Sequence, residues 1–150
     1  MLYSLVAALL VAAQSMVSAP PVSDPLSVIP GDWQIIDTAT GKPLQDCTRA
    51  QSFVVSPDRK SVIFIEKWAD NWTARYAVLH YEADRVLTII EGEKRKTETG
   101  DPVLFWAHFD GPDKFRWRRY DWAPTERTTT QWQRCPARSA SPGVASGQPQ

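Results

Sequence analysis

Short alternating segments, each ended by turn residues, constrain this chain more than any other feature. Between residues 33 and 135, brief runs either alternate apolar and polar side chains or gather β-branched and aromatic residues. Turn formers separate the runs, as in Pro57-Asp58-Arg59-Lys60 and Asp110-Gly111-Pro112-Asp113. No segment sustains the apolar period of an amphipathic helix. The chain is therefore predicted to be all-β.

The segments predict eight strands, each joined to the next by a turn or loop. Their expected ranges are 33–36, 52–56, 61–68, 73–81, 85–91, 102–109, 114–122 and 126–135. Residues 44–47 fit either a short strand or a loop, and the charged stretch 92–101 fits a solvated loop. Closure of such a meander removes exposed sheet edges. We therefore expect an eight-stranded antiparallel up-and-down barrel, with a β-sandwich as the alternative.

The flanks of the strand region have a different composition. Residues 1–19 carry no charged side chain, and their Leu/Val/Ala run is shorter than the roughly 20 residues that span a bilayer. This pattern predicts a signal peptide rather than an N-terminal helix. Residues 20–30 are proline-rich and predict an extended spacer. Residues 31–136 form the predicted barrel domain, and 137–150 a disordered tail.

The charge balance excludes some partners. The chain has 17 Lys and Arg against 17 Asp and Glu, so no net field favours nucleic acid or an anionic membrane. With the leader removed, no segment remains that would form a stable membrane anchor. We expect a secreted or periplasmic protein that binds no nucleic acid.

Two cysteines lie near the two ends of the strand region. Cys47 and Cys135 are predicted to form a disulfide, as is common in exported proteins. The alternative is two buried free thiols, whereas a metal site is disfavoured because neither has a ligand-spaced Cys or His beside it. The bridge requires residues 38–47 to fold back along the barrel after the first strand.

The start of the first strand carries a family-like motif. Gly31-x-Trp33 in a small exported eight-strand chain resembles the lipocalin (calycin) signature. The resemblance implies that Trp33 packs at the closed end of a barrel, under an arginine from the last strand. Arg134 is the better match for this arginine and Arg127 the second. A Thr-Asp-Tyr type motif and a final helix, both expected in that family, are absent.

The segment 102–122 is the richest in aromatic and arginine residues. Alternation places Phe115, Trp117 and Arg119 on one face, with an arginine at the polar end. Apolar walls with one arginine fit a small ligand that carries a polar or anionic group. The alternative is aromatic pairing that only stabilises the sheet. The predicted binding residues are Phe64, Tyr76, Phe105, Trp106, Trp117 and Arg119.

No catalytic residue, metal site or cofactor is predicted. The chain lacks a nucleophile elbow and a Cys/His nucleophile pair. His108 and Asp110 fit a strand-end histidine beside a turn better than a proton-transfer pair, and Asp101, Asp110 and Asp113 fit turn formers better than calcium ligands. In 73–81, alternation predicts that Val78 and His80 share one face.

These observations predict a non-enzymatic, lipocalin-like protein that binds a small apolar or amphipathic molecule. The runner-up is a protein-interaction module, either an envelope-associated structural protein or a periplasmic protease inhibitor that inserts residues 20–30 into a protease cleft. A third class is carbohydrate binding, for which Trp68, Trp72 or Trp122 would lie flat on the surface.

Overall fold

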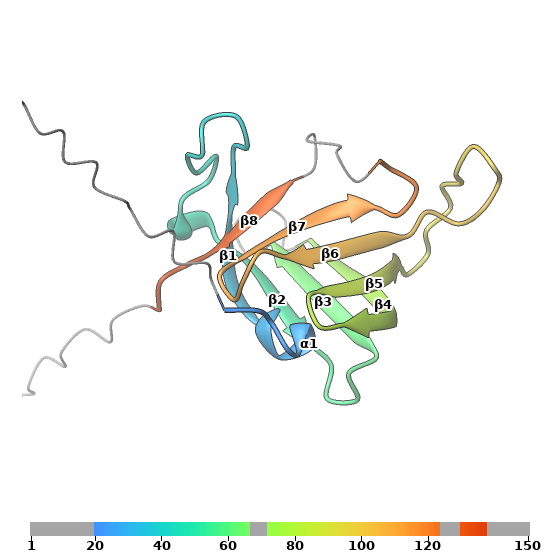
Figure 1. The fold of residues 1–150 in the computed structure, drawn as a ribbon, viewed down its shortest axis with the longest axis horizontal. Coiled ribbons are helices and arrows are strands. Elements are labelled where there is room, and N and C mark those ends of the chain that lie inside the picture. Colours follow the sequence, from blue (N-terminus) through green and yellow to red (C-terminus); the bar gives the residue numbers. More distant parts are fainter. Residues whose placement is uncertain (1–19, 67–71, 124–129, 138–150) are drawn as a thin grey trace, which may run out of the picture.

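The first and last strands pair with each other, and this pairing closes the sheet. In the computed structural model, which describes residues 20–66, 72–123 and 130–137, β1 (Gly31–Ile36) pairs with β8 (Gln131–Arg134) from Trp33↔Arg134 to Ile36↔Gln131. The strand order around the barrel is the order in the sequence (Figure 1). The intervening strands are β2 (Gln51–Val55), β3 (Ser61–Glu66), β4 (Thr73–Glu82), β5 (Arg85–Ile90), β6 (Phe105–Phe109) and β7 (Lys114–Arg119). The predicted up-and-down barrel is confirmed.

The two ends of the barrel differ. The tight turns 56–60, 83–84 and 110–113 lie at the end where β1 begins, which we call the closed end. The longer connections 37–50 and 91–104 lie at the opposite, open end, where 91–104 projects away from the strands (Figure 1). Residues 67–71 and 124–129, with Trp68 and Arg127, lie outside the described residues, as do the predicted signal peptide and residues 138–150 of the predicted tail.

Trp33 and Arg134 form the closed end. Trp33 is fully buried, and the guanidinium carbon of Arg134 lies 4.2 Å from the centroid of its ring. Arg134 also donates hydrogen bonds to the backbone carbonyls of Val28, Pro30 and Pro112. A guanidinium offers five N–H donors in a planar fork, which suits several acceptors and an aromatic face at once.

Gly31 leaves room for this arginine. A Cβ at position 31 would lie 2.8 Å from Arg134 Nη1, and Gly31 has φ of +129°, which other residues rarely adopt. Glycine is therefore required at position 31 for two reasons: Arg134 approaches too closely for a side chain, and the backbone has a positive φ.

Residues 20–30 are not an extended spacer. They include the four-residue helix α1 (Pro25–Val28), and Val22, Leu26 and Ile29 are at most 5% exposed. Pro25 is tolerated because an N–H group in the first turn of a helix has no intrahelical acceptor, so its absence from proline breaks no helical hydrogen bond. The Ile29 carbonyl accepts a 2.9 Å hydrogen bond from Trp33 Nε1. The segment is thus a cap on the closed end, shown beneath the barrel in Figure 1. No described helix is long and apolar enough to cross a membrane.

Aromatic rings fill the middle of the barrel. We call this set the aromatic column: Trp33, Phe53, Phe64, Tyr76, Phe115, Trp117 and Trp132. Trp33 meets Phe115 edge-on at 4.7 Å between centroids, and Phe115 stacks on Trp132 at 5.8 Å. At the other extreme, Trp117 stacks on Tyr76 at 5.0 Å. Such pairs add about 0.5–1.5 kcal/mol each beyond the area that they bury.

A bulge in β4 changes which side chains face inward. The pairing with β5 shifts between Val78 and His80, so that His80 opposes Leu87 and Tyr81 opposes Val86. The predicted common face for Val78 and His80 is therefore wrong, because one extra residue reverses the alternation.

The predicted disulfide between Cys47 and Cys135 is confirmed, with Cα atoms 5.6 Å apart. The chain reaches it by folding back along β1: the Leu44 N–H donates to the Ile35 carbonyl at 2.9 Å. The short 3₁₀ helix η1 (Cys47–Arg49) then presents Cys47 to the end of β8.

The disulfide predicts a large effect of its removal. Because the bridged residues are 88 positions apart, the Cys47→Ser/Cys135→Ser double variant should lose about 4–5 kcal/mol of unfolding free energy in the chain-entropy model. Urea unfolding followed by circular dichroism measures this loss. Reduction should destabilise the wild type and leave the double variant unchanged. Two free thiols in peptide mapping of non-reduced exported protein would contradict the assignment.

Candidate functional site

Two adjoining hollows lie at the open end of the barrel, beside the β5–β6 loop and the end of β7. One has a volume of about 480 Å³ and is lined by Lys96, Thr97, Glu98, Thr99, Arg119, Asp121 and Trp122. The other has about 470 Å³ and is lined by Leu87, Thr97, Thr99, Asp101, Pro102, Leu104, Tyr120 and Asp121. They share Thr97, Thr99 and Asp121, so we treat them as one feature and call it the rim groove.

One wall of the rim groove is the tip of the β5–β6 loop. Hydrogen bonds within the tip hold its conformation. The Thr97 N–H donates to the Asp101 carbonyl at 2.8 Å, and Thr99 Oγ1 donates to Asp101 Oδ2 at 2.7 Å. Gly100 supplies the left-handed turn with φ of +88°. An isolated antiparallel β-bridge between Lys96 and Pro102 closes the base of the tip. Short polar side chains that bond to nearby backbone are typical of ordered turns.

The other wall is the chain that leaves β7. The Tyr120 N–H donates to the Leu104 carbonyl at 2.9 Å, which ties this wall to the base of the loop. The Trp122 N–H donates to the Arg119 carbonyl at 3.2 Å, and Arg118 donates to the Trp122 carbonyl at 3.2 Å. These bonds fix the turn that carries Tyr120, Asp121 and Trp122.

The polar half of the groove carries charges of both signs. Arg119 donates two parallel hydrogen bonds to Asp121, at 3.0 and 2.7 Å, and its guanidinium carbon lies 5.5 Å from the Trp122 ring centroid. Lys96 and Glu98 line the same hollow. Because Asp121 already neutralises Arg119, this half suits a neutral polar or zwitterionic group better than a bare anion.

The apolar half is supported from behind by Trp106. Tyr120, which is 56% exposed, stacks on Trp106 with ring centroids 6.3 Å apart. The Arg85 guanidinium carbon lies 4.7 Å from the same Trp106 ring and holds it in place. Leu87, opposite Trp106 in the β5–β6 pairing, completes this wall.

The predicted binding residues do not share one location. Arg119 opposes Phe105 on the inner face and lines the rim groove at the open end, whereas Trp106 lies on the outer face. Phe64, Tyr76 and Trp117 are members of the aromatic column. Phe105 opposes Thr88 and Arg119, which places it on the inner face near the open end. The structure therefore does not bring these six residues into one interior pocket.

Leu87, Pro102 and Leu104 line the rim groove and were not predicted. The only sequence signals for them were the apolar runs on either side of the charged stretch 92–101. Nothing in those runs indicates that the loop folds against the end of β7.

An ion pair lies over the inner side of the open end. Arg95 donates forked hydrogen bonds to Glu93, whose side chain is 5% exposed, and the Arg95 guanidinium carbon is 5.7 Å from the Phe105 ring centroid. The hydrogen bonds from Arg95 lower the pKa of Glu93 to about 2. Burial raises the pKa of the nearby Tyr76. The Arg95 guanidinium therefore covers one face of the Phe105 ring.

The histidine and aspartate candidates do not form a proton-transfer pair. Asp110 pairs with Arg116 at 3.3 Å, and the buried His108 Nε2 has no hydrogen-bond partner within the described residues. Burial, followed by the charges of Arg118 and Arg85, lowers the pKa of His108. Within residues 20–66, 72–123 and 130–137, no cluster of His, Cys, Asp and Glu could hold a metal ion.

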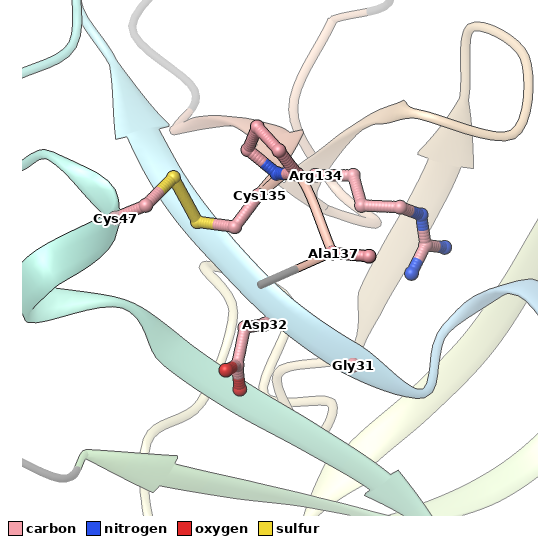
Figure 2. Close-up of a pocket in the computed structure, with 7 residues that line it drawn as sticks. Gly31, Asp32, Cys47, Arg134, Cys135 and Ala137 are labelled. Atoms are coloured by element: carbon pink, nitrogen blue, oxygen red, sulfur yellow. A yellow bond between two sulfur atoms is a disulfide. The ribbon is translucent and has the colours of Figure 1, made fainter. Parts of the chain in front are cut away.

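A third hollow, of about 410 Å³, lies beside the disulfide. Figure 2 shows the Arg134 side chain extending away from the bridge between Cys47 and Cys135, with the Asp32 carboxylate on another side. Both polar groups have structural partners: Arg134 bonds the closed-end carbonyls, and Asp32 accepts a hydrogen bond from Ser52. This hollow therefore belongs to the structural framework of the closed end.

The fold and the rim groove define the class of this protein: a closed, eight-stranded, up-and-down β-barrel with a groove at its open end. This architecture is compatible with the lipocalin-like barrel that Gly31-x-Trp33 suggested. Comparison with protein-family models, curated proteins and solved structures found no match.

The Glu93–Arg95 pair predicts a pH-dependent contribution to stability. The pKa of Glu93 is lowered from 4.5 to about 2 in the folded protein, so its stabilising effect is complete above the unfolded value and is lost as pH falls towards the folded one. Glu93→Gln should unfold at lower urea than wild type at neutral pH, and the difference should shrink on acidification through this range. Glu98→Gln, on the same loop, is the control for loss of one charge. A difference that is constant with pH would contradict the prediction.

Proposed function

We propose that the protein is a non-enzymatic binder of a small amphipathic molecule, and that the molecule lies in the rim groove. The single observation that supports this proposal is the union of the two hollows. One half is walled by Leu87, Pro102, Leu104 and Tyr120, and the other by charged and polar side chains. A molecule with an apolar tail and a polar head matches this division, since apolar walls with a few placed polar groups are typical of ligand sites.

The charges of the polar half suggest the kind of head group. Lys96 and Arg119 stand beside Glu98 and Asp121, so each sign has an opposite within the same hollow. A zwitterionic head could pair with both signs without leaving a charge unsatisfied. A purely anionic head would compete with Asp121 for Arg119.

The filled interior supports a site at the rim rather than in the centre. Phe64, Tyr76 and Trp117, which sequence patterns suggested as pocket walls, have ring centroids 5.0–6.3 Å from those of their neighbours in the column. A ligand in that space would have to separate packed rings, and packed cores resist such changes.

We further infer a secreted or periplasmic location. The Cys47–Cys135 disulfide supports it, because disulfides form and persist mainly in oxidising compartments. An amphipathic ligand is compatible with that location, since such molecules dissolve poorly and need carriers between membranes.

Isothermal titration calorimetry with dodecylphosphocholine, below its micelle concentration, tests the rim groove. The zwitterionic amphiphile should bind the full chain, and Tyr120→Ala should weaken it about tenfold, because it removes an aromatic wall from the apolar half. Dodecyl sulfate, with the same tail and only a negative charge, should bind more weakly. Leu79→Ala is the matched control, since Leu79 is 52% exposed and lines neither hollow.

Two results would refute the proposal. One is the absence of binding by either amphiphile to the folded protein. The other is equal weakening by Tyr120→Ala and Leu79→Ala, which would mean that any exposed apolar side chain contributes alike.

A second candidate is a protein-interaction module. The observation that favours it is the group of exposed apolar side chains on open-end connections, namely Leu44, Trp72, Tyr120 and Trp122, which are 37–66% exposed. Tryptophan and tyrosine are enriched at binding hot spots. Val22, Leu26 and Ile29 of residues 20–30 are buried at the closed end, which favours a structural role for this segment over the inhibitory one considered from the sequence. Trp72→Ser separates the candidates, because Trp72 does not line the rim groove: amphiphile binding should persist.

A further inference from the structure

A further hollow lies on the outer surface of the barrel, between the loop that follows β1 and the strands β7 and β8. It has a volume of about 510 Å³ and is lined by Thr38, Ala39, Arg116 and Gln131. A smaller hollow of about 80 Å³ adjoins it, since Gln131 lines both, and adds Lys114 and Gln133. We call the two together the β8 groove. Its larger part falls within the range of roughly 300–1,000 Å³ that is typical of small-ligand sites.

One wall of the β8 groove belongs to a row of cations on β7. Phe115 and Trp117 are members of the aromatic column and face the barrel interior. Because side chains alternate along a strand, the residues between and beside them face outward. These are Lys114, Arg116 and Arg118, which we call the basic strip. Successive cations of the strip are about 6–7 Å apart along the strand, since each residue advances about 3.3 Å.

The strands on either side of the basic strip do not neutralise it. The residues that oppose the strip on β8 and β6 are Gln133, Gln131, His108 and Trp106. Opposite charges facing each other across strands stabilise a sheet, whereas none of these four side chains carries a negative charge. The strip is therefore a local excess of positive charge in a chain whose net charge is zero.

Asp110 provides the only ion pair of the basic strip within the described residues. Its carboxylate lies 3.3 Å from Arg116 Nη2, and the two side chains are 53% and 35% exposed. Exposed pairs with a single contact are weak, so an incoming carboxylate can take the place of Asp110. Arg118 donates to the Trp122 carbonyl at 3.2 Å, and Lys114 is exposed. Lys114 and Arg116, which line the β8 groove, therefore retain positive charge for a ligand.

The opposite wall of the β8 groove is a turn with a fixed conformation. The Asp37 N–H donates to the Lys42 carbonyl at 2.8 Å. The Asp37 carboxylate accepts hydrogen bonds of 2.8 Å from the Ala39 N–H and from the Thr40 hydroxyl. This carboxylate is thus occupied within its own loop. The ordered turn presents Thr38 and Ala39 to the groove.

The uncharged groups of the β8 groove suit hydroxyl groups. The side-chain amides of Gln131 and Gln133 each offer donors and an acceptor, and the Thr38 hydroxyl can act as either. The tryptophans that flank these residues on β6 and β8, Trp106 and Trp132, are only 8% and 5% exposed. Neither offers a platform for stacking nucleobases, on which binding of single-stranded nucleic acid depends.

We propose that the β8 groove binds an acidic oligosaccharide, a chain of sugar rings that carry carboxylates. The carboxylates pair with Lys114 and Arg116, and the ring hydroxyls form hydrogen bonds with Gln131, Gln133 and Thr38. The site uses no residue that lines the rim groove. It is thus a second binding function, independent of the amphiphile.

Isothermal titration calorimetry of the full chain with tetragalacturonate tests this site. The matched ligand control is the methyl ester of tetragalacturonate, which has the same rings without the charges. Tetragalacturonate should bind at low salt, and its Kd should rise at least about tenfold between about 20 and 200 mM NaCl, because salt screens exposed charges. The ester should bind at least about tenfold more weakly than the acid at low salt.

Three variants locate the ligand. Lys114→Gln/Arg116→Gln should weaken the binding of tetragalacturonate about tenfold or more at low salt. Lys60→Gln/Arg75→Gln is the matched control and should change it less than about twofold, because it removes two positive charges elsewhere, from the β2–β3 turn and from β4. Gln131→Ala should weaken binding about threefold at either salt concentration, since it removes an uncharged hydrogen-bonding group.

Four outcomes would overturn the site. Equal binding of the acid and the ester would show that the carboxylates play no part. Equal weakening by the two double variants would mean general attraction between charges. Absence of binding to folded wild-type protein at low salt would remove the proposal. An oligothymidylate of the same charge that binds more tightly than tetragalacturonate, and depends on Lys114 and Arg116, would assign the groove to phosphodiesters. The amphiphile titration uses other ligands and variants, so failure at the rim groove is distinguishable from failure here.

Discussion

The stacking of Arg134 on Trp33 is the interaction on which the rest of this structure depends. Trp33 lies on the first strand and Arg134 on the last, directly opposite each other, so their contact forms only when the barrel closes. The same guanidinium binds the carbonyls of Val28 and Pro30, which brings the N-terminal cap onto the closed end. It also binds the Pro112 carbonyl, which fixes the β6–β7 turn. One side chain therefore joins three distant parts of the chain.

This organisation explains where binding can take place. With Trp33 buried at one end, the aromatic column continues inward through Phe115 and Trp132 to Trp117 and Tyr76. The column packs the interior of the barrel, and it occupies the space where many small barrels hold a ligand. The binding that we propose therefore lies at the open end, where the connections are longer and the rim groove forms between the β5–β6 loop and the end of β7.

The strands and their order could be predicted from sequence because alternation records which side chains face the core. The closure and the disulfide followed from the same pattern combined with two cysteine positions. Other features depend on contacts that local patterns do not contain. Prolines suggested an extended segment at 20–30, yet Leu26 and Ile29 gain enough burial on the barrel end to order it. The bulge after Val78 reverses which side chains of β4 face inward, and no residue in that segment indicates the bulge. The rim groove depends on a backbone bond between Tyr120 and Leu104, which are separated by a whole hairpin.

Arg134 closes the barrel through its planar, forked geometry and not merely through its charge. Urea unfolding of wild type, Arg134→Met and Arg134→Lys at neutral pH separates the two effects. Both variants should lose at least about 2 kcal/mol of unfolding free energy, because lysine keeps the charge but cannot bind several carbonyls and the Trp33 face together. If Arg134→Lys were as stable as wild type, or if Arg134→Met lost less than about 0.5 kcal/mol, as is usual for surface substitutions, the closed end would not depend on this interaction.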